Sequence, residues 1–219
     1  MLHAAAEGKL EVRAEDDGSR TLVGSFPYGK TATLSDGGRR GRPRKERFKS
    51  KAFEFRVDDP EAEIHFLVGH DFDKPLASKL SDTLKLTDTA EALTLEARLL
   101  PSILETQHGR DAISLLTAGL AVGLSPGFRI PPERAVEDAE EVTQEPNDDK
   151  PDEDGEPQKG ALIRTVKAAL LFELSLVTRP AFEDAQVEAR SWKAPGRCRQ
   201  GHVDWGTGRI TYPSAYRWR

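Results

Sequence analysis

Apolar and polar residues alternate in several short segments of this chain, and this pattern predicts a fold rich in β-sheet. In residues 91–99 every second position is apolar, namely Leu93, Leu95, Ala97 and Leu99. A period of two places successive side chains on opposite faces of a strand, so that one face can be buried. Related patterns predict further strands at residues 20–26, 52–57, 63–70, 120–130, 161–167 and 170–178.

Only two segments favour a helix. Residues 101–119 begin with Pro101, which suits the first turn of a helix, and end at Gly119, a common stop. Residues 180–190 form a second, weaker candidate. Many strands with few helices predict a mostly β domain with peripheral helices, which is either an α+β fold or a β-barrel.

The composition excludes several classes of protein. A chain of 219 residues can form one domain with a substantial core. No apolar run approaches the ~18 residues of a membrane helix, and the N-terminus has no pattern of a secretion signal. We therefore expect a soluble, cytoplasmic protein. The single cysteine, Cys198, excludes an internal disulfide and a cysteine metal cluster, and the histidines form no HExxH zinc motif.

Charge is concentrated in three blocks, although the net charge is only -5. Residues 38–51 hold eight basic residues and predict an exposed loop. This loop shows no repeated interleaving of aromatic residues and no known reader motif, which argues against nucleic-acid binding. Residues 133–157 hold twelve acidic residues and few apolar ones, and they predict a disordered loop, either a solvated insertion or a binding segment. A basic, poorly structured tail at 191–219 is expected to follow a domain over 1–190.

Ser125 is the first candidate for chemistry. Residues 123–127 read Gly-Leu-Ser-Pro-Gly and match the G-x-S-x-G pattern of a nucleophile elbow. That elbow requires a helix directly after the serine, and Pro126 with Gly127 disfavours one. The α/β-hydrolase interpretation is therefore rejected. Ser125 stays a candidate nucleophile in an apolar strand whose backbone we expect to be irregular and accessible.

A histidine and a glutamate are the next candidates. His70 ends a row of apolar residues on the predicted inward face of its strand, whereas His65 faces the other way. By itself His70 is more readily explained as a structural histidine at a sheet edge. Glu173 lies in an otherwise apolar strand, where an unpaired carboxylate is costly. It either forms a salt bridge, for example with Arg164, or orients an imidazole, with Asp71 or a bound water as the alternative orienting group.

Four motifs, taken in order, carry a resemblance to a known family. They are Glu46 with Lys51-Ala52-Phe53, then Val68-Gly69-His70-Asp71, then Leu124-Ser125-Pro126-Gly127-Phe128, and finally Phe172-Glu173-Leu174-Ser175-Leu176-Val177 with Pro180-Ala181. Over about residues 22–187 this order resembles the prohead (capsid maturation) serine proteases of tailed phages. The resemblance implies a fold related to the herpesvirus assemblins, which is a closed β-barrel ringed by helices.

The resemblance also implies an activity. Ser125 falls on the nucleophile and His70 on the base, and Glu173 is the position we expect for the third member of a triad. The implied enzyme is a serine endopeptidase that needs no metal or cofactor. Its implied substrates are the scaffold segment of the phage major capsid protein and the protease itself, as a homo-oligomer. It would act inside the assembling prohead in the host cytoplasm, encoded by a phage or a prophage.

Two other classes of function stay open. One is a catalytically inert scaffolding or assembly protein of the same fold, and the other is a small serine esterase. Labelling by an active-site serine probe that vanishes in Ser125→Ala excludes the inert protein. Cleavage of a capsid-protein peptide, but not of simple esters, excludes the esterase.

Overall fold

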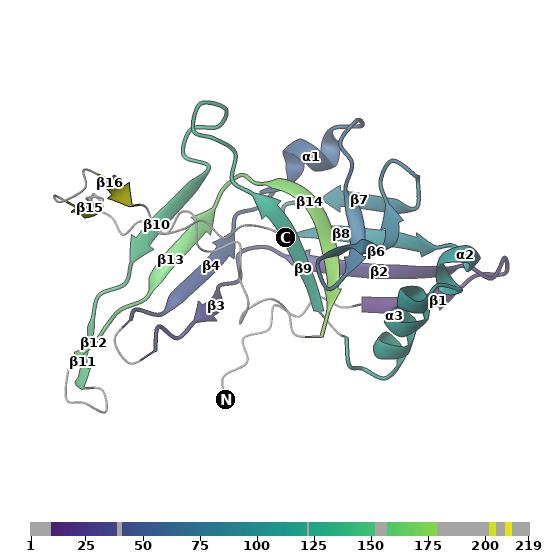
Figure 1. Cartoon of the computed structure of the whole chain (residues 1–219), viewed down its shortest axis with the longest axis horizontal. Coiled ribbons are helices and arrows are strands. Elements are labelled where there is room, and N and C mark those ends of the chain that lie inside the picture. The colour runs from purple at the N-terminus through teal and green to yellow at the C-terminus, as the bar shows by residue number, and fades with distance from the viewer. Residues whose placement is uncertain are drawn as a thin grey trace.

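Most strands of the described residues form three open, four-stranded β-sheets, which are accompanied by a few short helices (Figure 1). The computed structural model describes residues 10–38, 41–121, 123–151, 157–178, 202–204 and 209–211. This part is mostly β, as predicted. No sheet within it closes on itself, since each of the three four-stranded sheets has two edge strands, so the expected barrel is not confirmed. In the same residues, no helix is both long and apolar enough to cross a membrane.

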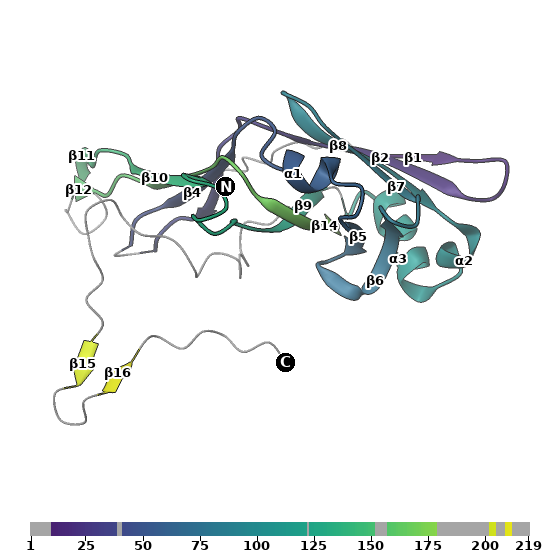
Figure 2. The same ribbon diagram turned by 90° about the horizontal axis from the view of Figure 1, so that it is seen from above.

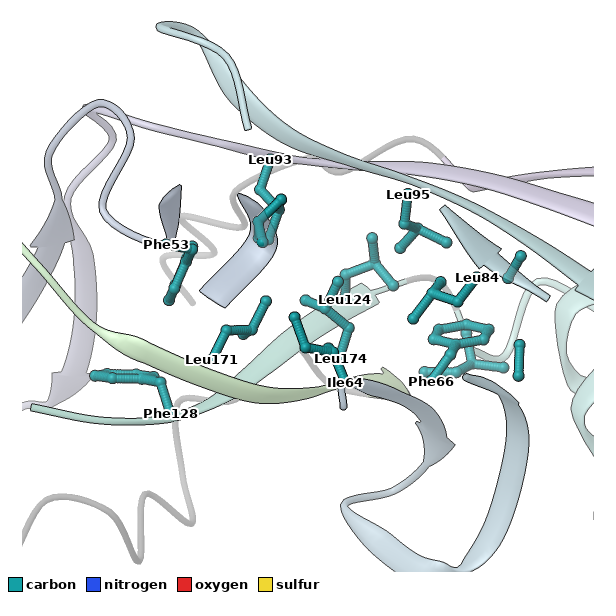
Figure 3. Close-up of a cluster of buried hydrophobic side chains, with 14 of the residues drawn as sticks. Phe53, Ile64, Phe66, Leu84, Leu93, Leu95, Leu124, Phe128, Leu171 and Leu174 are labelled. Atoms are coloured by element: carbon teal, nitrogen blue, oxygen red, sulfur yellow. The ribbon is translucent and has the colours of Figure 1, made fainter. Parts of the chain in front are cut away.

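Two of the sheets pack face to face and enclose the hydrophobic core (Figure 3). Leu93 and Leu95 project from one sheet toward Leu124 and Leu174 of the other. The first sheet has the order β1-β2-β8-β7, with β1 at Leu10–Ala14, β2 at Arg20–Pro27, β8 at Ala92–Leu99 and β7 at Leu84–Asp88. The other has the order β6-β5-β14-β9, with β6 at Asp71–Ser78, β5 at His65–Val68, β14 at Leu170–Val177 and β9 at Gly123–Arg129.

A third four-stranded sheet extends from this core at one end of the molecule, and the helices α2 and α3 lie at the other end (Figures 1 and 2). An aromatic cluster joins this third sheet to the other two sheets, since the Phe48 ring centroid lies 5.1 Å from that of Phe128 and 5.3 Å from that of Phe26. The sheet has the order β10-β13-β4-β3, with β10 at Glu140–Gln144, β13 at Leu162–Val166, β4 at Arg44–Phe48 and β3 at Ala32–Ser35.

Two of the charged blocks take part in this third sheet, which corrects two predictions. The expected basic loop over 38–51 contains β4, and the expected disordered loop over 133–157 contains β10. A further short pair, β11 (Asp148–Pro151) with β12 (Pro157–Gln158), extends from the end of β10 and β13. The composition of each block by itself did not predict these strands, because the basic and acidic blocks supply each other with partners of opposite charge. Lys45 of the basic block lies 3.0 Å from Glu145 of the acidic block.

Arg164 is the most buried charge in this sheet. Its side chain is 3% exposed and lies between two carboxylates, 3.1 Å from Glu46 on β4 and 2.7 Å from Glu140 on β10. A buried ion pair is costly to break because the remaining charge loses its compensation. The same sheet has an exposed pair for comparison, Lys167 with Glu141 at 3.1 Å.

We expect Arg164→Met to lower the free energy of unfolding by about 3 kcal/mol, because two partly buried carboxylates lose this guanidinium. Lys167→Met removes the cation of the exposed pair and should cost less than about 1 kcal/mol. Urea unfolding of both variants measures the difference. Equal losses of unfolding free energy in the two variants would show that the burial of Arg164 does not determine its contribution to stability.

The helices differ from expectation in two places. Residues 52–57 were predicted as a strand, but α1 spans Glu54–Asp58, because the buried Phe53 and Val57 are four residues apart and share one helix face. The helix predicted at 101–119 is divided into α2 (Pro101–Leu104) and α3 (Gln107–Thr117). Thr106 caps α3, since its side chain accepts a hydrogen bond from the Gly109 N–H.

The structure describes few of the residues after position 178. The helix predicted at 180–190 lies outside them. Of the tail at 191–219, the structure describes only the short antiparallel pair β15 (His202–Asp204) with β16 (Arg209–Thr211).

Candidate active site

His70 lies in a tight turn between β5 and β6, not on a strand as predicted. Gly69 and His70 have φ angles of 64° and 61°, and the flanking Val68 and Asp71 pair with each other. Two successive left-handed residues are typical of a type I′ hairpin turn, and histidine tolerates this conformation better than most residues. The turn is anchored to β14, because the Gly69 N–H donates to the Leu176 carbonyl at 3.0 Å.

The imidazole of His70 contacts the carboxylate of Glu173. The Nδ1 atom of His70 lies 2.6 Å from Oε1 of Glu173. The Glu173 side chain is 4% exposed, whereas the His70 side chain is 41% exposed. An ionised carboxylate only accepts hydrogen bonds, so a neutral imidazole in this contact donates from Nδ1 and keeps Nε2 as its acceptor. The alternative salt bridge between Glu173 and Arg164 is therefore wrong, since Arg164 pairs with other carboxylates.

A second hydrogen bond holds the Glu173 carboxylate from the other side. The Ser175 hydroxyl donates to Glu173 Oε2 at 2.7 Å and accepts a hydrogen bond from the His70 backbone N–H at 2.8 Å. Ser175 belongs to the sequence motif around Glu173, but no role was assigned to it from the sequence. The spacing of two residues was the only signal available, because the contact with His70 joins positions 105 residues apart.

Ser125 lies on the same sheet face as Glu173 and Ser175. In the antiparallel pairing of β9 with β14, Ser125 is opposite Ser175 and Gly127 is opposite Glu173. Directly opposed residues project to the same side of a sheet. Ser125 is only 3% exposed, so the expected accessibility is wrong. Its hydroxyl makes no hydrogen bond to His70 in the part of the chain described.

The local sequence around Ser125 suits its place at the edge of the sheet. Among the strands that the structure describes, β9 pairs only with β14. Pro126, which has no N–H to donate, is tolerated in such an edge strand. Gly127 is required for a different reason. A Cβ atom at this position would lie 1.9 Å from Glu173 Oε1, so the absent side chain makes room for the carboxylate.

Asp71, the alternative orienting group, has a different partner. Its carboxylate lies 2.9 Å from the Lys74 ammonium, and this hydrogen bond is the main cause that lowers the pKa of Asp71 below its ordinary value. Glu173 is therefore the carboxylate that contacts the imidazole. Within the ranges that the structure describes, no three side chains of His, Cys, Asp or Glu are grouped as a metal site.

Comparison with known proteins identifies the family of this chain. A family model described as caudovirus prohead serine protease matches residues 9–196. This range contains Ser125, His70 and Glu173. The chain therefore belongs to the family of caudovirus prohead serine proteases, which confirms the resemblance seen in the sequence. No curated protein and no solved structure is similar enough to the chain to count as a match.

Proposed function

We propose that this chain is a serine endopeptidase that cleaves the scaffold segment of the phage capsid protein, and itself, during prohead maturation. The observation that carries the proposal is the 2.6 Å contact between His70 and Glu173, on the sheet face that also holds Ser125. Membership of the prohead protease family supplies the substrate class. The proposed place of action is the assembling prohead in the host cytoplasm, and the proposed partners are the capsid protein and a second copy of the chain.

The proposed reaction is acyl transfer through Ser125. His70 Nε2 takes the proton of the Ser125 hydroxyl while Oγ attacks the carbonyl carbon of the peptide bond. The imidazolium then gives this proton to the leaving amine, and an acyl-enzyme ester remains. A water molecule, activated by His70 in the same way, hydrolyses the ester and restores the serine. The hydrogen bond between Ser125 and His70 has to form when substrate binds, as is common in such sites.

Glu173 and the backbone have separate roles in this mechanism. Glu173 keeps the proton on Nδ1 of His70 and stabilises the imidazolium that forms during attack. The negative oxygen of the tetrahedral intermediate requires hydrogen-bond donors. Pro126, directly after the nucleophile, has no N–H, so these donors have to come from other backbone amides or side chains.

One observation favours a second candidate, the inert assembly protein. Ser125 is 3% exposed, and in the described residues it makes no hydrogen bond to His70, which is what a protein that keeps the fold without the activity would show. The two candidates differ in whether Ser125 reacts.

Co-expression of the full chain with the capsid protein tests the proposal. We expect a gel to show a shortened capsid protein with the wild-type chain and the intact protein with Ser125→Ala. Purified chain should cleave a peptide from the scaffold segment but not p-nitrophenyl acetate. Intact capsid protein in both co-expressions, without labelling by a fluorophosphonate probe, would support the inert assembly protein. Rapid ester cleavage without peptide cleavage would support the esterase.

The glycine beside the carboxylate gives a further prediction. In Gly127→Ala the new Cβ overlaps Glu173 Oε1 and displaces the carboxylate from His70. We expect the rate of Ser125 labelling by a fluorophosphonate to fall about 10²-fold, as misplacement by about 1 Å commonly costs. In a Glu173→Ala background the same substitution should change the rate by less than about threefold. An equal loss in both backgrounds would show that Gly127 acts independently of Glu173.

A further inference from the structure

We propose that Ser175 is a positioning residue, whose hydroxyl sets the orientation of both His70 and Glu173. The inference rests on the proposed protease function and adds a fourth side chain to its site. Ser175 is 0% exposed and its hydroxyl is bonded to His70 and Glu173, so it acts through these two residues. It lies between the nucleophile and the base, because it is the cross-strand partner of Ser125 and accepts a hydrogen bond from the His70 backbone.

The direction of each hydrogen bond follows from the groups involved. The His70 backbone N–H can only donate, so the Ser175 oxygen accepts at 2.8 Å. The single proton of the hydroxyl is then available for Glu173 Oε2, at 2.7 Å. Since Oε2 is occupied in this way, Oε1 is the oxygen that meets His70 Nδ1. The three bonds form a closed ring through His70, Ser175 and Glu173.

This ring holds a backbone conformation that is otherwise unfavourable. His70 has a φ angle of 61°, in the left-handed region that non-glycine residues rarely occupy. The bond from its N–H to Ser175 ties this conformation to β14, and the bond from its imidazole to Glu173 ties the side chain to the same strand. Loss of the hydroxyl removes the bond partners of one backbone N–H and one buried carboxylate oxygen. Both groups then become free to leave the productive orientation.

Ser19 provides a matched control far from the site. It is 1% exposed, donates to Asp17 at 2.5 Å and accepts from the Arg98 guanidinium at 3.3 Å. Ser19→Ala therefore removes a buried hydroxyl that also bridges a carboxylate and an N–H. Any effect that follows from losing such a hydroxyl in general should be the same in the two variants.

The first measurement is the rate at which a fluorophosphonate probe labels the full chain. We expect Ser175→Ala to lower the maximal labelling rate about 10²-fold with little change in the probe concentration at half saturation, because bond formation and not binding is impaired. Ser19→Ala should stay within about threefold of wild type. A Ser175→Ala rate within threefold of wild type would overturn the proposal, and complete loss of labelling would indicate that Ser175 is itself the nucleophile.

The second measurement does not depend on activity. Nitrogen-15 NMR of the histidine side chains reports which ring nitrogen carries the proton. We expect the His70 signal, assigned from its absence in His70→Ala, to show the Nδ1–H form in wild type and in Ser19→Ala, and a mixture of both forms in Ser175→Ala. An unchanged Nδ1–H signal in Ser175→Ala would overturn the proposal. Wild-type chain that shows this dependence but is never labelled would leave the positioning role intact and contradict the protease function.

A third variant covers the case in which Ser175→Ala does not fold. Ser175→Cys keeps a weaker donor and acceptor at the same place. We expect its labelling rate and its His70 signal to lie between the wild-type values and the values expected when the hydrogen bonds of residue 175 are lost. Values equal to wild type in both measurements would overturn the proposal.

Discussion

Ser125→Ala is expected to abolish both fluorophosphonate labelling and cleavage of the co-expressed capsid protein, with rates at least about 10³-fold below wild type. The hydroxyl oxygen is the atom that would attack, and alanine has no substitute for it. The fold should be retained. The serine makes no hydrogen bond to His70 or Glu173 in the described structure, and alanine fits its buried place on β9.

The control for this variant is Ser19→Ala, which removes another buried serine hydroxyl distant from the site. Thermal unfolding of both proteins checks that the fold is retained. Activity of Ser125→Ala within about tenfold of wild type would remove Ser125 as the nucleophile.

His70→Ala should lose on the order of 10³-fold in labelling rate, as removal of a triad member does. The reason is that Glu173 contacts Nδ1 of this imidazole at 2.6 Å, so that Nε2 is the nitrogen that would take the Ser125 proton. His65 is the matched control. It is the register partner of Glu173 on β5, yet its ring lies against Phe72, with centroids 5.8 Å apart.

His65→Ala should therefore stay within about tenfold of wild type in the same labelling assay. A deeper loss in His65→Ala than in His70→Ala would assign the base to the other histidine. It would also show that the contact between His70 and Glu173 has only a structural role.

Alternation of apolar residues located most of the strands correctly, because burial of one sheet face needs little more than a local period of two. The pattern in 91–99 became β8, with Leu93, Leu95, Ala97 and Leu99 all buried. The same approach failed at 52–57, where a short apolar segment fits either period, and the buried pair Phe53 and Val57 is spaced for a helix. It also failed after Val68. The sequence pattern of the predicted strand continues to residue 70, but a two-residue turn ends the strand at Val68.

The charged blocks show a different limit. Composition predicted loops at 38–51 and 133–157 because each block, taken alone, repels itself and buries little. In the fold, β4 from the basic block and β10 from the acidic block both flank β13, and Arg164 on β13 lies between Glu46 and Glu140. A segment's own composition says nothing about charges that the topology brings beside it.

The sequence by itself determined the strand-rich class, the family and the three candidate side chains, because motif order and local periodicity are properties of the chain. Only the tertiary structure decided which carboxylate contacts His70. Asp71 is the neighbour in sequence but bonds to Lys74, whereas Glu173 is 103 residues away and lies 2.6 Å from the imidazole. The physical reason is that a left-handed turn at residues 69–70 directs the imidazole over β14, and hydrogen bonds across a sheet join residues that no local pattern relates.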